Sequence, residues 1–236
     1  NQKQEEVQKR ELYELRKSHE SIEIMDIKPS ENISSTDRWS SFNFTLASLH
    51  EDNSTITMIT VNDEPVRRGD MWRFDRGERE YHPEEYSYTN DTYLKGMERA
   101  FLDITVNESF FSEPTFLKSH YVKIEVITSY SNDFSKVFMP PTSVVEVEVQ
   151  SQWNSDASDY DQYLILDGSG SDHPGEGYMV QWSWHLENTT GSWDQDLTGR
   201  KVRADLPESG TYYLNLTVVD NFGMEGFDSL TYNYQG

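Results

Sequence analysis

The sequence predicts an all-β protein made of two β-sandwich domains in tandem, preceded by a short helix. Three observations lead to this prediction. From Ser21 onward hydrophobic and polar residues alternate with a period of two, the alternating runs are short, and Asn, Asp, Gly and Pro separate them. Alternation is the pattern of antiparallel strands with one solvated face, and many short strands joined by turns are typical of sandwiches. The 236 residues are enough for two such domains, each with its own core.

The first element is the helix, which we expect over residues 1–20. This segment contains no Gly or Pro and is rich in Gln, Glu, Lys and Arg, which are strong helix formers. Its apolar residues are too few for a wide buried face: Val7, Leu12, Tyr13 and Leu15. We therefore expect a solvated or loosely paired stalk. Because the sequence starts at Asn1, we interpret the stalk as the outer end of a missing N-terminal membrane anchor, with a frayed polar leader as the alternative.

Strands follow in two groups on either side of a proline pair. We expect the first group at 42–46, 56–61, 102–106 and 122–126, and the second at 145–149, 163–166, 179–184, 212–218 and 230–234. Between 64 and 95 the alternation fades, which indicates a long hairpin excursion or surface insertion. Pro140 and Pro141 cannot donate to a strand ladder and favour a stiff connector. The predicted divisions are a stalk over 1–20 and sandwich domains over 21–142 and 143–236.

The chain is strongly acidic, with 42 Asp and Glu against 20 Lys and Arg and a net charge of −22. Nucleic acids and anionic lipids attract clustered Lys and Arg, so this charge argues against both as main partners. No apolar run is long enough to cross a bilayer. We therefore expect contact with a membrane only through the missing N-terminal anchor.

Seven Asn-x-Ser/Thr triplets (sequons) are the sharpest functional signal. They begin at Asn32, Asn43, Asn53, Asn90, Asn107, Asn188 and Asn215. With 13 Asn, and with 43 Ser or Thr among 236 residues, random pairing would produce roughly two. The alternative interpretation is that these residue types are simply frequent in turns and on solvated strand faces. We interpret the triplets as N-glycan acceptors, which would put the protein outside the cytoplasm, at the cell surface.

The pattern also predicts where these side chains point. Asn43 is flanked by two Phe residues and Asn215 by two Leu residues. The pleat that buries those neighbours directs each Asn to solvent. Asn107 has the same phase, and Asn53 and Asn188 fall in expected turns. Most of the acceptor side chains should therefore lie on surfaces that do not pack.

The C-terminal domain carries three motifs in a fixed order. They are Leu-Asp-Gly-Ser-Gly-Ser-Asp at 166–172, Met-Val-Gln-Trp-Ser-Trp at 179–184 and Gly-Thr-Tyr-Tyr-Leu-Asn-Leu-Thr-Val-Val-Asp-Asn-Phe-Gly at 210–223. In order and spacing, residues 143–236 resemble the polycystic-kidney-disease (PKD) repeat. The chain departs from that family where it usually reads Trp-Asp-Phe-Gly-Asp-Gly, because Trp184 is followed here by His-Leu-Glu-Asn.

This resemblance implies an immunoglobulin-like sandwich in a surface or secreted protein, used as a spacer or adhesion module without catalysis. It implies that Trp184 is the core Trp. It also implies an inward strand face made of Tyr212, Leu214, Leu216 and Val218. The first domain, in its segments 54–63 and 121–142, resembles archaeal cell-surface proteins of the archaellum-associated and pilin-like kinds. In such proteins an N-terminal pilin-like or single-pass membrane helix leads into a β domain.

Catalytic and metal-binding motifs are scarce. The chain has no Cys, and it contains no phosphate-binding glycine loop, no HExxH motif and no nucleophile elbow. We therefore expect no enzyme activity and no obligatory cofactor. Calcium is the one ion that the sequence suggests, because carboxylates gather in or near glycine-rich turns: Asp156, Asp159, Asp161, Asp167, Asp172 and Glu176. Of these, Asp167 and Asp172 are the expected site residues.

Six Trp residues raise the possibility of a carbohydrate-binding platform. Core packing accounts for most of them, since Trp182 has the same strand phase as Trp184 and should point inward with it. Trp153 and Trp193 are the better candidates for exposed rings.

The sequence thus predicts a non-enzymatic, glycosylated, extracellular protein that serves as a spacer, adhesion or envelope-interaction module. Its partners would be other cell-envelope glycoproteins or copies of itself. The alternative is an accessory, PKD-containing region of a secreted hydrolase that presents substrate to a catalytic domain outside this chain. A third hypothesis makes the first domain a hydrolase that uses carboxylates such as Asp75, Glu84 and Glu85.

Overall fold

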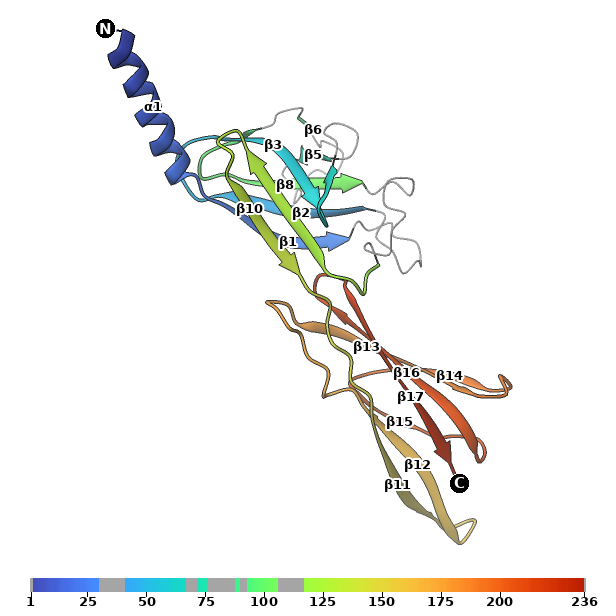
Figure 1. The fold of residues 1–236 in the computed structure, drawn as a ribbon. Helices are drawn as coiled ribbons and strands as arrows, with labels where there is room; N and C mark the ends of the chain where they lie inside the picture. Colours follow the sequence, from blue (N-terminus) through green and yellow to red (C-terminus); the bar gives the residue numbers. More distant parts are fainter. Residues whose placement is uncertain are drawn as a thin grey trace. The chain divides into compact units, whose positions relative to one another are not determined.

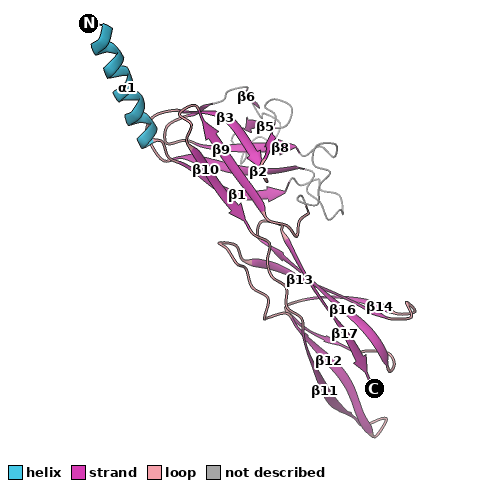
Figure 2. Cartoon of the chain, viewed as in Figure 1, coloured by secondary structure: helices cyan, strands magenta, loops and turns pink. Residues whose placement is uncertain are grey.

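The structure is a computed structural model that describes residues 2–29, 41–66, 72–75, 88–89, 93–105 and 117–235. Over these ranges the chain forms one helix, α1, followed by antiparallel strands (Figures 1 and 2). The prediction of a mostly β chain is confirmed. None of the described segments forms a helix that is both long and apolar enough to span a membrane.

Contacts within the chain define two compact units. The first comprises Asn1–Leu117 and Tyr121–Phe138, and the second comprises Lys118–His120 and Met139–Gly236. The division falls after Phe138 rather than at the predicted residue 142. The physical reason is that Thr142 already pairs with the second unit, because its backbone exchanges two hydrogen bonds of 2.8 and 3.0 Å with the backbone of Asp172.

Helix α1 (Gln2–His19) is solvated along most of its length. Its aliphatic side chains are about half exposed: Val7, Leu12 and Leu15. The C-terminal end of the helix is tied to the first unit. Asn132 Nδ2 donates to the carbonyl of Lys17 at 2.8 Å, and the buried Glu20 carboxylate accepts a 2.6 Å hydrogen bond from Thr128 Oγ1. The bond to Lys17 satisfies a carbonyl at the helix end that would otherwise lack a partner.

The first unit contains two main antiparallel sheets. One has the order β1-β2-β8-β5-β6, with β1 at Ile22–Pro29, β2 at Ser41–Ser48, β8 at Arg99–Thr105, β5 at Trp72–Asp75 and β6 at Tyr88–Thr89. The other has the order β10-β9-β3-β4, with β10 at Asp133–Phe138, β9 at Val122–Thr128, β3 at Ser54–Val61 and β4 at Glu64–Val66. The short β7 (Tyr93–Leu94) also pairs with β3.

Burial in the first unit follows the predicted alternation on some strands only. On β9 every second side chain is buried, as the period of two predicts. On β2, Thr45 and Ala47 should face solvent, but they are only 8% and 3% exposed. The prediction of one wet face is therefore wrong for residues 44–48 of this strand, where both faces are covered, whereas Asn43 on the outward face is partly exposed.

The segment 64–95 is also less of an excursion than its composition predicts. Strand β5 pairs with β8, with Trp72 opposite Ile104 and Phe74 opposite Leu102. Sheet pairing with a distant strand cannot be read from the local pattern of a four-residue strand. The rest of this segment, including Glu84 and Glu85, lies largely outside the described residues.

The second unit contains a three-stranded and a four-stranded antiparallel sheet. The first has the order β11-β12-β15, with β11 at Glu146–Asn154, β12 at Asp159–Asp167 and β15 at Lys201–Ala204. The second has the order β14-β13-β16-β17, with β14 at Asp194–Thr198, β13 at Met179–Asn188, β16 at Gly210–Asp220 and β17 at Glu225–Tyr234.

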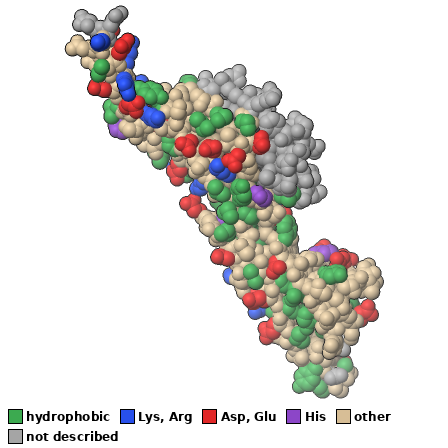
Figure 3. All heavy atoms as spheres, in the orientation of Figure 1, with side chains coloured by type: hydrophobic (Ala, Val, Ile, Leu, Met, Phe, Trp, Pro, Cys, Tyr) green, Lys and Arg blue, Asp and Glu red, His purple; other side chains and the backbone are tan. Residues whose placement is uncertain are grey.

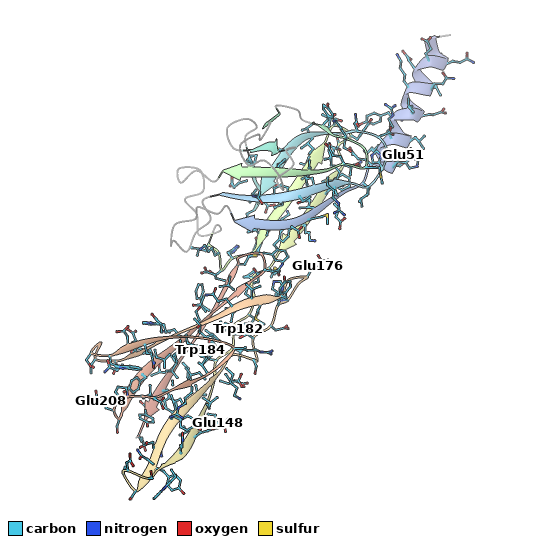
Figure 4. The ribbon with its side chains drawn as sticks, turned by 180° about the vertical axis from the view of Figure 1, so that it is seen from behind. Glu51, Glu148, Glu176, Trp182, Trp184 and Glu208 are labelled. Carbon is cyan, nitrogen blue, oxygen red and sulfur yellow. The ribbon has the colours of Figure 1, made fainter. Side chains whose placement is uncertain are left out.

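One hydrophobic core joins these two sheets. Trp184 on β13 is 1% exposed, and its Nε1 donates to the carbonyl of Gly199 at 2.9 Å. Trp182 lies beside it on the same strand (Figure 4) and packs against the core. The predicted inward face of β16 is confirmed, because all four of its members are buried: Tyr212, Leu214, Leu216 and Val218. The second unit is therefore a β-sandwich.

The start of β16 is held by a buried tyrosine. The Tyr212 side chain is fully buried, and its hydroxyl donates to the carbonyl of Glu208, four residues upstream, at 2.7 Å. Burial raises the pKa of this phenol above its ordinary value. The arrangement is that of the tyrosine corner of immunoglobulin-type sandwiches, in which a hydroxyl satisfies the backbone where the chain enters a central strand.

Tyr212→Phe should lower the free energy of unfolding of the second unit by about 1 kcal/mol, since one partly buried hydrogen bond is lost and the ring is kept. Chemical denaturation followed by tryptophan fluorescence measures this change. Tyr213→Phe is the matched control, because the neighbouring ring is 43% exposed and should give almost no change. Equal effects of the two substitutions would contradict the assigned role of the Tyr212 hydroxyl.

Candidate glycan-accepting surface

Four of the seven sequons lie in the described part of the chain. Asn32, Asn90 and Asn107 lie outside it. The other four side chains differ in exposure. Asn53 is exposed, Asn43 and Asn215 are partly exposed, and Asn188 is buried.

Asn53 lies in the turn between β2 and β3, as the sequence predicts. Its Oδ1 accepts a hydrogen bond of 3.1 Å from the backbone nitrogen of Gly96. This contact orients the amide and leaves the acceptor nitrogen, Nδ2, on an exposed side chain. Asn53 therefore combines a defined orientation with access from solvent.

Asn43 lies on β2, in register with Lys28 on one side and Asp103 on the other. Its own side chain is partly exposed, but the next outward residue of the strand, Thr45, is 8% exposed. Thr45 supplies the hydroxyl of this sequon. The site is therefore more covered than the alternation of β2 predicts.

Asn188 begins the β13–β14 turn, as the sequence predicts, because its carbonyl accepts a 2.9 Å hydrogen bond from the backbone nitrogen of Gly191. The expectation that its side chain is open to solvent is wrong. Asn188 is the last residue of β13 and is only 6% exposed. Its Oδ1 accepts hydrogen bonds from the backbone nitrogens of Ser192 and Trp193 at 2.9 and 3.2 Å, and its Nδ2 donates to Ser192 Oγ at 2.8 Å. The amide therefore closes the β13–β14 turn, as Asn side chains often do. A sugar on Nδ2 would require this turn to open.

Asn215 lies on the outer face of the four-stranded sheet, as its phase predicts. In register it is opposite His185 on β13 and Ser229 on β17, and Thr217, the hydroxyl residue of its sequon, is opposite Phe227. A shallow depression of about 430 Å³ opens beside it. The residues that line it are Asn215, Leu216, Thr217, Phe227, Asp228 and Ser229.

The neighbouring part of this face carries acidic side chains. His185 Nδ1 lies 2.7 Å from Asp196 Oδ1 and its Nε2 lies 3.9 Å from Glu187 Oε2. The hydrogen bond to Asp196 raises the pKa of His185 above its ordinary value. On the face drawn in Figure 3, acidic side chains are spread over both units rather than collected in one patch. Such a surface is well hydrated and repels other acidic surfaces.

The expected calcium residues are not brought into a metal site. Asp167 Oδ1 accepts from the backbone nitrogen of Ser169 at 2.9 Å, and Oδ2 accepts from Lys201 Nζ at 2.8 Å. Asp172 is exposed, and its backbone makes the bridge to Thr142. Within the described ranges, no group of three or more acidic or His side chains could hold a metal ion. The Asp167 carboxylate instead stabilises the turn at Ser169 and forms an ion pair with Lys201.

The two candidates for exposed Trp rings, Trp153 and Trp193, differ in their environment. Trp153 is 54% exposed and meets Tyr160, which is 62% exposed, edge to face with ring centroids 5.1 Å apart. The two residues are paired across the β11–β12 hairpin close to its turn. Hydrophobic side chains gather at this end of the second unit in Figure 3. Trp193 is not an exposed ring, because it packs edge-on against the buried Tyr212 at 5.6 Å.

Two residues of these sites were not predicted from the sequence. Phe227 was missed because β17 was expected to begin near residue 230, and the stretch Glu-Gly-Phe-Asp-Ser at 225–229 shows no hydrophobic alternation. Tyr160 was missed because β12 begins at Asp159 in a polar stretch. Extending each predicted strand backward by the register of its partner would have found both.

No protein-family model matches the chain, and no curated protein matches it. Among solved structures, domains A168–A170 of titin are 9% identical, with 92% of this chain and 68% of that chain covered and a TM-score of 0.33. A β-glucuronidase from Ruminococcus gnavus is 9% identical, with 88% and 38% covered and a TM-score of 0.29. BcpA, the major pilin subunit of Bacillus cereus, is 12% identical, with 91% and 67% covered and a TM-score of 0.19. At these scores the similarities identify neither a family nor a function.

Asp167→Asn should destabilise the second unit by about 1–2 kcal/mol at pH 7, a value reduced for solvent screening because the Lys201 partner is 58% exposed. The contacts with Lys201 and Ser169 lower the pKa of Asp167 from 3.8 to about 2, so the folded state favours the ionised carboxylate. That stabilisation is fully present above pH 4 and is lost as the pH falls from about 4 to about 2. The stability difference between wild type and variant, measured by urea denaturation from pH 3 to 7, should therefore shrink toward acid. A difference that is constant with pH would contradict the assignment.

Proposed function

We propose that this protein is a non-enzymatic glycoprotein of the cell surface, extracellular and held to the membrane through an N-terminal segment. It would act as a spacer, adhesion or envelope-interaction module. Both units would be immunoglobulin-like sandwiches, the second of them PKD-like. The buried Trp184 and the tyrosine corner at Tyr212 support this finer interpretation of the second unit.

The accessibility of Asn53 and Asn215 is the observation that carries the proposal. N-glycosylation joins the Asn Nδ2 to the anomeric carbon of a sugar and breaks the bond from that carbon to the phosphate of a lipid-linked donor. The amide loses one proton to the medium, and a separate transferase supplies the donor. A bulky hydrophilic sugar is tolerated only on a surface that does not pack, and these two side chains meet that condition.

The surface charge supports the same role. With a net charge of −22, the chain repels copies of its own acidic surface and stays hydrated. Partners would therefore dock through limited areas, such as loops and edge strands, rather than through a broad face. We propose other envelope glycoproteins, or specific contacts with a second copy, as those partners.

Peptide mapping by mass spectrometry of the protein purified from its own cells tests the proposal. We expect additions of sugar mass on the peptides that contain Asn53 and Asn215. Asn188 should be bare, because its side chain is buried and its amide closes the β13–β14 turn. Asn53→Gln and Asn215→Gln should each remove one addition without changing the other. Unmodified peptides at every sequon would overturn the glycoprotein assignment.

The exposed pair Trp153 and Tyr160 favours one second candidate, the accessory module of a secreted hydrolase. Exposed aromatic rings bind the apolar faces of sugars, and such a pair at a hairpin tip could hold polysaccharide near a catalytic domain. This candidate needs no glycan on the chain itself.

Pull-down with insoluble polysaccharides, such as cellulose and chitin, distinguishes the two candidates. If the second candidate is right, the chain binds one of them and Trp153→Ala raises the apparent Kd about tenfold, by loss of one stacking contact of about 1.5 kcal/mol. The matched control is Trp193→Phe, which changes a Trp that packs against the core. No binding by the wild type would remove the second candidate.

A further inference from the structure

We infer that the depression beside Asn215 is the binding surface for the glycan carried by Asn215. The first sugar ring packs against Phe227 and forms hydrogen bonds with the hydroxyls around it. This inference rests on the proposed function, since it requires that Asn215 carries a sugar. It assigns to Phe227 a role that the fold does not otherwise explain.

Phe227 is an exposed aromatic ring on a solvated sheet face. Its side chain is 55% exposed. The neighbouring residue, Gly226, is buried, and a Cβ on it would lie 2.2 Å from the carbonyl oxygen of Pro141. Residue 226 must therefore face inward, and the strand pleat directs residue 227 outward. The ring cannot turn into the core, so it can be covered only by something that lies on the outer face.

The register brings this ring to the sequon. Asn215 is opposite Ser229 and Thr217 is opposite Phe227, so Asn215 and Phe227 are diagonal neighbours on one face. Diagonal side chains on an antiparallel pair lie about 7–8 Å apart at their backbones, which is within reach of an aromatic ring. Both residues line the same depression. A sugar attached to Asn215 Nδ2 starts inside it.

The chemistry of the depression suits a sugar ring. One wall is the apolar face of Phe227, against which the C–H groups of a pyranose can pack. Thr217 and Ser229 supply hydroxyls that can donate to or accept from sugar hydroxyls. Asp228 is already committed, because its Oδ2 accepts from the backbone nitrogen of Val145 at 2.8 Å and its Oδ1 from that of Ser229 at 2.9 Å. The other lining groups, a phenyl ring and hydroxyls, suit a neutral and hydroxyl-rich occupant.

A thermal-unfolding cycle on the full chain tests the inference. Four proteins are made in the native host: wild type, Asn215→Gln, Phe227→Thr and the double variant. Loss of the glycan should lower the Tm of the second unit by about 3–6 °C when Phe227 is present, and by less than about 1 °C when Thr replaces it. Thr217→Ala, which destroys the sequon but keeps the Asn, should reproduce the effect of Asn215→Gln.

Two controls distinguish the effect of the glycan on the Tm from the direct effects of the substitutions. The same four proteins made in a host without N-glycosylation should show no coupling between positions 215 and 227. Tyr213→Thr changes another exposed ring of the same face that does not line the depression, and it should leave the effect of Asn215→Gln unchanged.

The outcomes distinguish this inference from the proposed function. Suppose that Asn215 is glycosylated and that its glycan raises the Tm equally with Phe and with Thr at position 227. The proposed sugar-binding surface is then wrong, and the glycoprotein assignment stands. If Asn53 is glycosylated and Asn215 is bare, the inference is overturned in the same way. If every sequon is bare, both fail.

Discussion

The burial of Trp184 between the two sheets of the second unit is the constraint on which the other features of that unit depend. Its ring is 1% exposed, and its indole nitrogen donates a hydrogen bond to the carbonyl of Gly199. A slip of one residue would move this ring to solvent and would reverse every side chain of β13. Because β13 is paired with β16, and β16 with β17, one buried ring determines which residues of three strands face water. Asn215 and Phe227 are outside because Trp184 is inside.

The β16–β17 turn joins this core to the outer face. The Asp220 carboxylate, 1% exposed, accepts from the backbone nitrogens of Phe222 and Met224 at 2.8 Å and lies 3.0 Å from His173 Nε2. Burial raises the pKa of Asp220, while these hydrogen bonds oppose the rise. A buried carboxylate with several partners costs much less than an isolated one. The turn holds the register that puts Phe227 opposite Thr217, so a polar network in the interior positions a site on the surface.

Sequence patterns predict the strands that have one covered face and a long, regular alternation of apolar and polar residues. The inward residues of β16 and the alternation of β9 follow directly from a period of two. The same reasoning failed on β2, where Thr45 is covered. It did not find β1 and β10, or the shorter strands β4, β5, β6, β7, β14 and β15. It also treated Asn188 as an open acceptor. Local patterns carry no information about which distant backbone lies opposite, and these strands and this side chain are defined by such partners.

The sequence by itself determined the β class, the acidic surface and the positions of the sequons, because each depends only on residue type and on spacing along the chain. Only the tertiary structure decided which acceptors are open, that Asp167 is held by Lys201, and that Phe227 lies beside Asn215. Those outcomes depend on strand register and on packing between segments far apart in sequence. The exposure of a side chain depends on which segments pack around it, and the tertiary structure determines those segments.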